Sequence, residues 1–120
     1  NLNTYIYTFV ASVILTLLLY VIKNNDEKKT TIYEKILTIL SGYFLLPLII
    51  ALPFYLSIYN LTFVNSYFEA ISGFTSTGFT IFDNINHIDQ SLILWRSASQ
   101  WVGGLYFLFS ILEFLIFLQL

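Results

Sequence analysis

The stretch Leu61-Thr-Phe-Val-Asn-Ser-Tyr-Phe-Glu-Ala-Ile-Ser-Gly-Phe-Thr-Ser-Thr-Gly-Phe-Thr-Ile-Phe82 decides how the chain folds. It is too apolar for an ordinary surface loop. It is also too short and too interrupted to cross a bilayer, which takes about 20 predominantly apolar residues in a helix. Both properties together are typical of a re-entrant segment, which enters a membrane and returns to the same side. The sequence therefore predicts an integral membrane protein with a re-entrant element.

The two halves of this stretch carry different local signals. Ser66 followed three residues later by Glu69 matches a capping box, which predicts a short pore helix over residues 66–74, roughly 13 Å long. The run Thr75-Ser-Thr-Gly-Phe-Thr80 predicts an extended filter strand over residues 75–80, because Gly78 permits backbone angles that aim successive carbonyls into a pore. The negative C-terminal end of the helix favours a cation there. A plain turn is the alternative, since Thr/Ser-Gly runs are common turn signals.

Three long apolar segments flank or precede this stretch. They predict membrane spans over residues 1–22, 36–59 and 91–118. The third contains Arg96 and Glu113 and is interpreted as one long helix, because Arg96 lies near one end, where it can reach the interface or a buried partner. The predicted fold class is all-α integral membrane, with three transmembrane helices plus a short re-entrant pore helix and filter strand.

The distribution of basic residues predicts the orientation of the chain. Four of the five basic residues lie between the first two spans: Lys23, Lys28, Lys29 and Lys35. The connection of residues 60–90 has no Lys or Arg. The positive-inside rule therefore makes residues 23–35 a cytoplasmic loop and residues 60–90 an outer loop. The N-terminus would then face outward, and the absence of methionine leads us to expect a processed or partial chain with a further helix upstream.

The composition excludes several function classes. The chain is 58% hydrophobic and 10% charged, with a net charge of -2, whereas soluble domains are about 25% charged. Without a basic cluster, no nucleic-acid partner is expected. The absence of cysteine and the single His87 argue against a transition-metal site. No nucleophile–base pair or phosphate-binding glycine loop is present, so the chain is not expected to be an enzyme or to need a cofactor.

Small residues predict a close contact between the short helix and the third span. Ser66, Ala70 and Gly73 are spaced to share one face of the short helix. Ser99 and Gly103 form a matching face on the third span. Small faces of this kind let two membrane helices approach closely.

Two further features are interpreted as structural. An arginine inside a membrane is a functional candidate by default, and Glu69 is the evident partner for Arg96. We favour a pair that locks the short helix to the third span over an ion relay, with helix capping by Glu69 as an equal alternative. Pro47 and Pro53 fall inside the second span, where a kinked packing helix is favoured over a gating role.

Two motifs now resemble a known family. Phe68-Glu-Ala-Ile-Ser-Gly-Phe-Thr-Ser-Thr-Gly-Phe-Thr80, followed by Leu94-Trp-Arg-Ser-Ala-Ser-Gln-Trp-Val-Gly-Gly104, resembles the Trk/Ktr (TrkH-like) family of bacterial potassium transporters. The similarity covers about residues 32–112, and two motifs at this spacing make it specific. In that family one chain carries four helix–pore loop–helix repeats around one pore. The resemblance implies an N-terminal fragment in which residues 36–118 form the first repeat.

The resemblance also implies site residues. The family's filter glycine maps onto Gly78, and potassium would bind filter carbonyls of Thr75, Ser76, Thr77, Gly78 and Phe79. Structural support is expected from Glu69, Arg96, Gly103 and Gly104. Two departures stand out: Ser76 replaces a common threonine, which we expect to be mild, and Leu105-Tyr106 follow the glycine pair where another glycine is usual.

The implied function is potassium (monovalent cation) transport as part of a Trk/Ktr-type uptake transporter, multi-pass in the bacterial inner (plasma) membrane. The implied partners are the lipid bilayer, the remaining pore repeats or further copies in a homo-oligomer, and a cytoplasmic nucleotide-binding regulatory subunit. No cofactor is expected, and K+ is the transported ion. The alternative is a non-conducting membrane remnant or assembly subunit from a split or truncated transporter gene, because one loop cannot encircle an ion.

Overall fold

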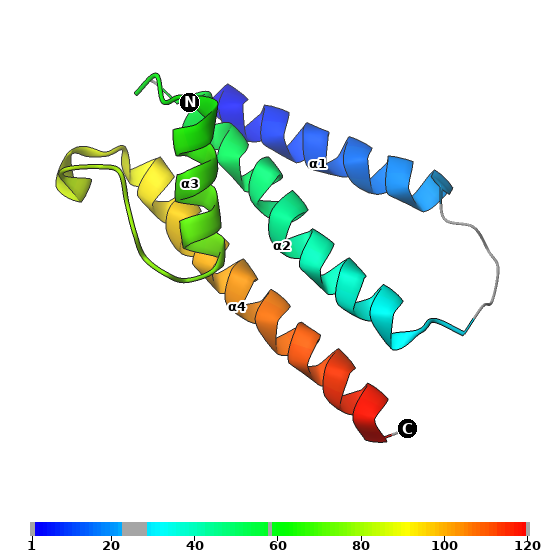
Figure 1. Ribbon diagram of the computed structural model, residues 1–120. Coiled ribbons are helices and arrows are strands. Elements are labelled where there is room, and N and C mark those ends of the chain that lie inside the picture. The colour runs from blue at the N-terminus through cyan, green and yellow to red at the C-terminus, as the bar shows by residue number, and fades with distance from the viewer. Residues whose placement is uncertain (1, 23–28, 58, 120) are drawn as a thin grey trace.

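The computed structural model describes residues 2–22, 29–57 and 59–119, and within them it contains helices but no strand (Figure 1). The helices in chain order are α1 (Leu2–Ile22), α2 (Ile32–Tyr55), α3 (Phe63–Phe74), the short 3-10 helix η1 (Ile85–His87) and α4 (Gln90–Gln119).

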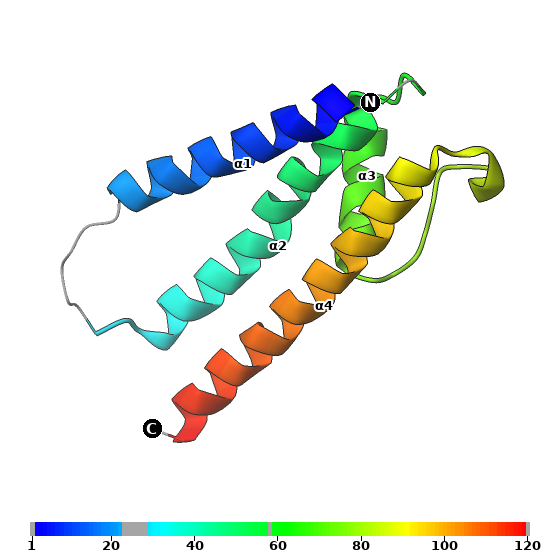
Figure 2. The same cartoon turned by 180° about the vertical axis from the view of Figure 1, so that it is seen from behind.

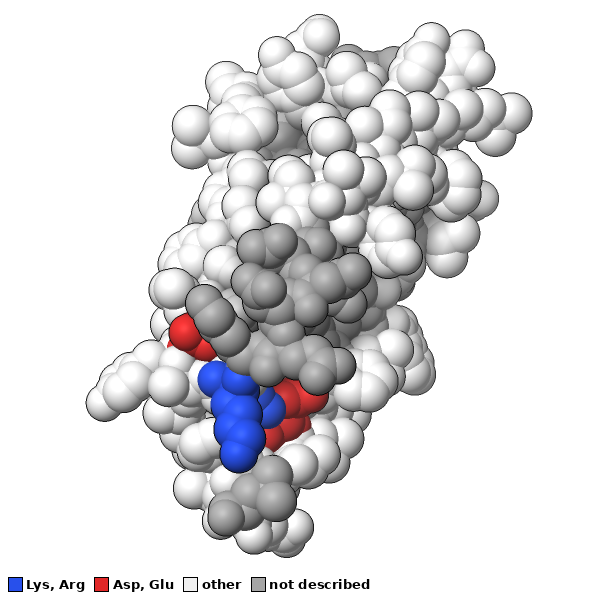
Figure 3. Space-filling view, turned by 90° about the vertical axis from the view of Figure 1, so that its right-hand side faces the viewer, with Lys and Arg blue, Asp and Glu red and all other residues white. Residues whose placement is uncertain are grey.

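Three of these helices, α1, α2 and α4, are long and apolar enough to cross a membrane. The all-helical fold with three candidate spans is therefore confirmed, and α4 is one continuous helix of 30 residues, as expected. On the face drawn in Figure 3, the coloured charged side chains lie together in the lower half of the view, and the surface drawn in white has no Lys, Arg, Asp or Glu. Such a surface suits helices whose solvent is lipid.

α2 begins and ends earlier than the predicted residues 36–59. Its N-terminal end is fixed by the backbone N–H of Thr31, which donates to Glu34 Oε2 at 3.1 Å. The predicted span began at the first residue of the uncharged run. The charged residues before it can also be helical, because the first turn of the helix can extend into the membrane–water interface. At the other end, Tyr55 closes α2 soon after Pro53.

The basic connection is only partly described. Lys35 lies in the first turn of α2 rather than in a loop, and its Nζ is 3.2 Å from Glu113 Oε2 near the end of α4. This exposed ion pair links the first turn of α2 to the C-terminal part of α4. Lys23 and Lys28, which carried part of the orientation argument, lie outside the described residues.

Side chains from the other helices hydrogen-bond α2 near its prolines. Pro47 and Pro53 lie inside α2 and are buried. A proline lacks the N–H for the carbonyl four residues earlier, and its ring crowds the preceding turn. Three residues before Pro47, the carbonyl of Phe44 accepts a hydrogen bond from Tyr67 Oη of α3 at 3.0 Å.

The same arrangement recurs at the second proline. The carbonyl of Ile50, three residues before Pro53, accepts from Trp95 Nε1 of α4 at 3.0 Å. Tyr106 Oη of α4 also donates to the carbonyl of Ile39 at 3.0 Å. Because lipid offers no hydrogen bonds, such donors stabilise a proline-containing span. They also fix α3 and α4 against α2.

α3 packs against α4 through small residues on both helices, as the sequence predicted. A Cβ added to Gly73 would come within 2.5 Å of Ser99 Oγ, and one added to Gly103 would collide with the carbonyl of Phe74. Ala70 is fully buried. In both views α3 ends partway along α4, and the following segment returns to the end of the molecule where α3 began (Figures 1 and 2).

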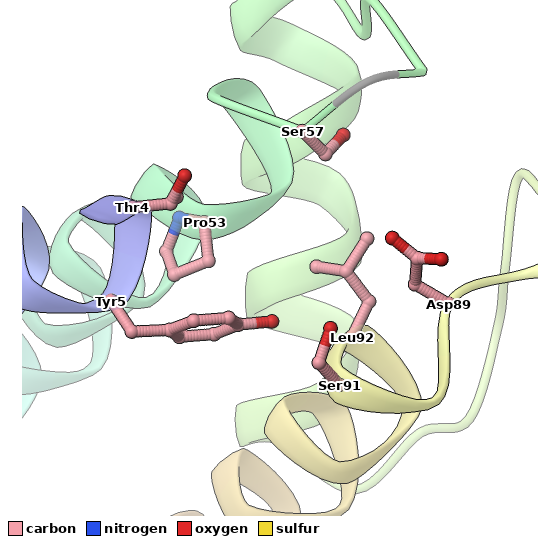
Figure 4. Close-up of a pocket in the computed structure, with 7 residues that line it drawn as sticks. All are labelled: Thr4, Tyr5, Pro53, Ser57, Asp89, Ser91 and Leu92. Atoms are coloured by element: carbon pink, nitrogen blue, oxygen red, sulfur yellow. The ribbon is translucent and has the colours of Figure 1, made fainter. Parts of the chain in front are cut away.

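The N-terminal part of α1 packs at the end of the molecule where α3 and α4 begin. Tyr5 of α1, Pro53 of α2 and Leu92 of α4 line one small cavity, into which Tyr5 projects (Figure 4). The ring of Tyr5 also packs against that of Trp95, with centroids 5.7 Å apart. The N-terminal helix is thereby held beside the part of α4 that faces α3.

Replacing Trp95 tests the hydrogen bond to α2. Trp95→Phe keeps an aromatic ring but removes the donor to the Ile50 carbonyl, so we expect a loss of about 1 kcal/mol in the free energy of unfolding. Thermal unfolding in detergent micelles measures it. Trp101→Phe is the matched control, because Trp101 is 77% exposed. Equal shifts in both variants would contradict the role of this hydrogen bond.

Candidate functional site

α3 starts earlier than predicted and has a different cap. It begins at Phe63, and Thr62 Oγ1 accepts a hydrogen bond from the N–H of Asn65 at 3.3 Å. Ser66 lies inside the helix and donates to the Thr62 carbonyl at 3.0 Å. The predicted capping box of Ser66 and Glu69 is therefore wrong. Glu69 has partners elsewhere, and the next threonine upstream takes the capping role.

α3 ends in a Schellman motif. The N–H of Ser76 donates to the Gly73 carbonyl at 3.0 Å, and the N–H of Thr77 donates to the Ser72 carbonyl at 3.1 Å. Ser76 has φ +58°, the left-handed conformation that this motif needs just past a helix. The expected strand over residues 75–80 is therefore replaced at its start by a turn, and no residue in that range belongs to a strand.

The turn directs three backbone carbonyls away from α3. In a trans peptide, an N–H and the preceding carbonyl point in opposite directions. The N–H groups of Ser76, Thr77 and Gly78 point back to the last carbonyls of α3. The carbonyls of residues 75–77 therefore point away, and within the described chain they accept no hydrogen bond. No cluster of metal-ligating side chains occurs in the described ranges, so these oxygens are the candidate cation ligands.

The hydroxyl groups of the same segment are turned back onto α3. Thr75 Oγ1 donates to the Ile71 carbonyl at 2.7 Å, and Thr77 Oγ1 donates to the Ser72 carbonyl at 3.2 Å. Ser72 Oγ in turn donates to the carbonyl of Phe79 at 2.6 Å. The hydroxyls therefore hold the shape of the loop.

Arg96 of α4 holds the next two carbonyls. Its Nη2 donates to the Phe79 carbonyl at 2.9 Å and to the Gly78 carbonyl at 3.2 Å. Gly78 has φ +81°, which glycine adopts without strain. The five predicted filter carbonyls thus divide into two groups: those of residues 75–77 are free of hydrogen bonds within the described chain, and those of Gly78 and Phe79 are bound to Arg96.

Glu69 of α3 holds the segment that follows. Its side chain is fully buried, and Oε1 accepts from Thr80 Oγ1 at 2.7 Å and from the N–H of Ile81 at 2.6 Å. Oε2 lies 3.2 Å from Arg96 Nη1 in an ion pair whose geometry is not that of a hydrogen bond. The predicted pairing of Glu69 with Arg96 is confirmed, and capping of α3 by Glu69 is wrong.

This ion pair clamps residues 78–81 between α3 and α4. The Arg96 side chain is 13% exposed and that of Glu69 is 0% exposed. Removing two such charges from water costs several kcal/mol each, and only good pairing with extra hydrogen bonds offsets it. Here each charged group also makes two hydrogen bonds to the loop. The loop is thus part of what stabilises the pair.

The two glycines of α4 have different surroundings. Gly103 is buried against the Phe74 carbonyl at the end of α3, which fits its predicted supporting role. A Cβ added to Gly104 would meet nothing within 4 Å. Gly104 therefore contributes no packing contact of this kind in the described chain. It lies instead in a groove of 320 Å³ lined by Gln100, Trp101, Gly104, Leu105 and Leu108.

Arg96→Leu tests the clamp. The variant leaves the Glu69 carboxylate buried without its counter-ion, so we expect a loss of about 3–5 kcal/mol in the free energy of unfolding and impaired assembly. Thermal unfolding in detergent measures the loss. Lys35→Leu is the control, because it removes a basic residue from the exposed pair with Glu113 and should cost less than about 1 kcal/mol. Unchanged stability in Arg96→Leu would refute the clamp.

Substitutions of Ser76 test the turn. Ser76→Gly removes the strain of a left-handed residue and should stabilise the chain by about 1 kcal/mol. Ser76→Thr should destabilise it, because a β-branched side chain fits positive φ poorly. The expectation that serine in place of threonine is a mild change stays a prediction, which this pair of variants tests. Thermal unfolding monitored by circular dichroism distinguishes the two variants. Equal melting temperatures for Ser76→Thr and the unchanged chain would rule out this turn.

A family model and several known proteins are similar to this chain, and all are named as cation or potassium transport proteins. Residues 2–120 match the TrkH family, described as a cation transport protein. An uncharacterized cation transporter of Methanocaldococcus jannaschii is 28% identical over 105 residues, covering 87% of this chain and 22% of the relative. The Trk system potassium uptake protein TrkI of Halomonas elongata is 36% identical over 66 residues, covering 55% of this chain and 12% of the relative.

A third relative is the Trk system potassium uptake protein TrkG of Escherichia coli, 39% identical over 46 residues, covering 38% of this chain and 10% of the relative. No solved structure matches the chain. The chain thus spans 22% of the archaeal relative and 10–12% of the two bacterial ones. With its family match and three candidate spans, it is a multi-pass membrane protein that belongs to the TrkH family of cation transport proteins, a transporter family and not an enzyme family.

Proposed function

We propose that the chain is one pore unit of a potassium-conducting transporter and that the ion passes beside residues 75–79. One observation carries the proposal: three carbonyl oxygens point away from α3 and accept no hydrogen bond from the described residues, on a loop that Glu69 and Arg96 hold from both sides. Backbone carbonyls replace the hydration shell of K+ in selective pores. The two bacterial relatives named as Trk potassium uptake proteins support potassium as the ion.

α3 and the following loop form a re-entrant element in this proposal. α3 has 12 residues, too few to span a bilayer, and the segment after it returns to the end where α3 began (Figure 1). Irregular backbone at membrane depth is tolerated only where it is buried in protein or lines water. The outward carbonyls of residues 75–77 would then line the water-filled path.

The division of the carbonyls refines the predicted filter. In this unit the cation ligands are the carbonyls of residues 75–77, and Gly78 supplies the bend that lets the chain reach Arg96. The guanidinium of Arg96 lies close to this path, but its pairing with Glu69 offsets its charge and reduces repulsion of a cation. Gly78 and Phe79 therefore act by placing the ligands.

The proposal requires further pore units, because one loop cannot encircle an ion. These are either the remaining repeats of a longer transporter or further copies of this chain. The resemblance to Trk/Ktr transporters extends the proposal to a cytoplasmic nucleotide-binding regulatory subunit and to the bacterial inner membrane. The alternative is a non-conducting subunit, because the described residues contain one such loop and one loop cannot encircle an ion.

Ion flux distinguishes the two functions. The purified chain is reconstituted in liposomes, and rubidium uptake is measured for it and for Gly78→Asp, which places a carboxylate beside the ligands. Asn84→Asp is the matched control: it adds the same charge in the exposed outer loop and keeps an oxygen acceptor for the N–H of Asn86. We expect uptake that only Gly78→Asp abolishes.

The other outcomes are equally informative. Uptake that survives Gly78→Asp would contradict the assignment of the filter. Absence of uptake by the unchanged chain would reject conduction by this chain alone and favour the non-conducting subunit.

A further inference from the structure

An aromatic cluster lies at the point where α3 ends. We define it by three residues: Tyr43 of α2, Phe74 of α3 and Tyr106 of α4. The ring centroids are 5.1 Å apart for Tyr43 and Tyr106, 5.6 Å for Phe74 and Tyr106, and 5.8 Å for Tyr43 and Phe74. Both contacts of Tyr43 are edge-to-face, an arrangement that aromatic rings favour. Phe74, the last residue of α3, is buried here. The cluster therefore joins three helices at the C-terminal end of α3.

Tyr106 also reaches into a space that α2 leaves open for it. Its hydroxyl donates to the Ile39 carbonyl at 3.0 Å. A Cβ added to Gly42, one turn further along α2, would collide with the same hydroxyl. The missing side chain of Gly42 is thus what lets the Tyr106 ring lie between α2 and α4. The tyrosine and the glycine form a matched pair.

Tyr106 and Gly103 hold the last residue of α3 together. They are three residues apart on α4 and therefore share one face of that helix. Gly103 lies against the carbonyl of Phe74, and Tyr106 packs against its ring. Thr75 follows directly, with the first of the carbonyls that accept no hydrogen bond within the described chain. A displacement of Phe74 would therefore move these carbonyls with it.

We infer that Tyr106 is a positioning residue for the carbonyls of residues 75–77, which it holds in place by supporting the ring of Phe74. The inference rests on the proposed function, because these carbonyls are the proposed cation ligands. The hydrogen bonds of the Schellman motif fix the turn relative to α3, and the clamp of Glu69 and Arg96 fixes the residues after it relative to α4. Neither set of contacts reaches α2. Tyr106 contacts both α2 and Phe74, so it fixes the end of α3 against the third helix.

Amide hydrogen exchange tests this role. The isotope-labelled chain in lipid nanodiscs is followed by NMR at the N–H groups of Ser76 and Thr77, which close α3. Tyr106→Leu removes the ring beneath Phe74, and we expect several-fold faster exchange at both amides. The N–H of Ile81 should keep its rate, because Glu69 holds it independently. Tyr106→Phe keeps the ring contacts and should leave all three rates unchanged.

Phe107→Leu is the matched control. It also replaces an aromatic ring of α4 by leucine, but Phe107 is 55% exposed, so exchange at Ser76 and Thr77 should not change. Unchanged exchange at these two amides in Tyr106→Leu would overturn the inference. Equal acceleration at Ile81 would also overturn it, because it would show a general loosening of the fold.

Gly42→Ala tests the matched pair from the side of α2. Its methyl group would push against the Tyr106 hydroxyl, so we expect a melting temperature several degrees lower and faster exchange at Ser76 and Thr77. In the Tyr106→Leu background the hydroxyl is absent, and the same change should cause little further loss. Equal losses in the two backgrounds would refute the pairing, since independent sites are additive.

Rubidium uptake with potassium or sodium as competitor separates this inference from the proposed function. If the chain conducts, Tyr106→Leu should reduce the preference for potassium several-fold, and Tyr106→Phe should keep it. Uptake with an unchanged preference in Tyr106→Leu would overturn the inference and leave the proposed function standing. Absence of uptake by the unchanged chain would reject conduction by this chain alone, and the exchange rates would still decide the role of Tyr106.

Discussion

The buried ion pair between Glu69 and Arg96 determines where the loop lies. Neither charge would be stable in this buried position alone, and each makes two hydrogen bonds to the loop: Glu69 binds Thr80 and Ile81, and Arg96 binds Gly78 and Phe79. The contact between α3 and α4 and the conformation of residues 78–81 are therefore one network. A pair that gained nothing from the loop would be a weak stabiliser, because desolvation would outweigh the attraction.

The same constraint, that backbone polar groups need partners where water is absent, organises α2. Two prolines disturb its hydrogen bonding, and donors from α3 and α4 bind its carbonyls. Tyr67 and Trp95 thus donate to carbonyls next to those whose helical donor each proline lacks, and they hold α3 and α4 against α2. Because these donors belong to the two helices that carry the loop, α2 acts as the scaffold against which the site is positioned.

The sequence predicts the features that depend on composition and spacing. The three spans follow from hydropathy, the contact of Gly73 with Ser99 from residue size, and the Glu69–Arg96 pair from the cost of an unpaired charge. Local capping was predicted less well, because Thr62 and Ser66 are both good caps and only tertiary contacts of Glu69 decide between them. The turn at Ser76 has no sequence signal, since glycine is the usual residue there. The unequal surroundings of Gly103 and Gly104 depend on where α3 ends.

The position of Ser76 bears on how the proposed filter keeps its shape. A non-glycine residue at positive φ costs about 1–2 kcal/mol and persists only where surrounding contacts impose it. Here the contacts lie on both sides of the free carbonyls: the hydrogen bonds that close α3 precede them, and the clamp of Glu69 and Arg96 follows them. Residues 75–77 are thus fixed at their ends, while their carbonyl oxygens accept no hydrogen bond from the part of the chain that the structure describes. In the proposed pore, the protein would set the spacing of the ligands before the ion arrives, and neighbouring loops would complete the ring.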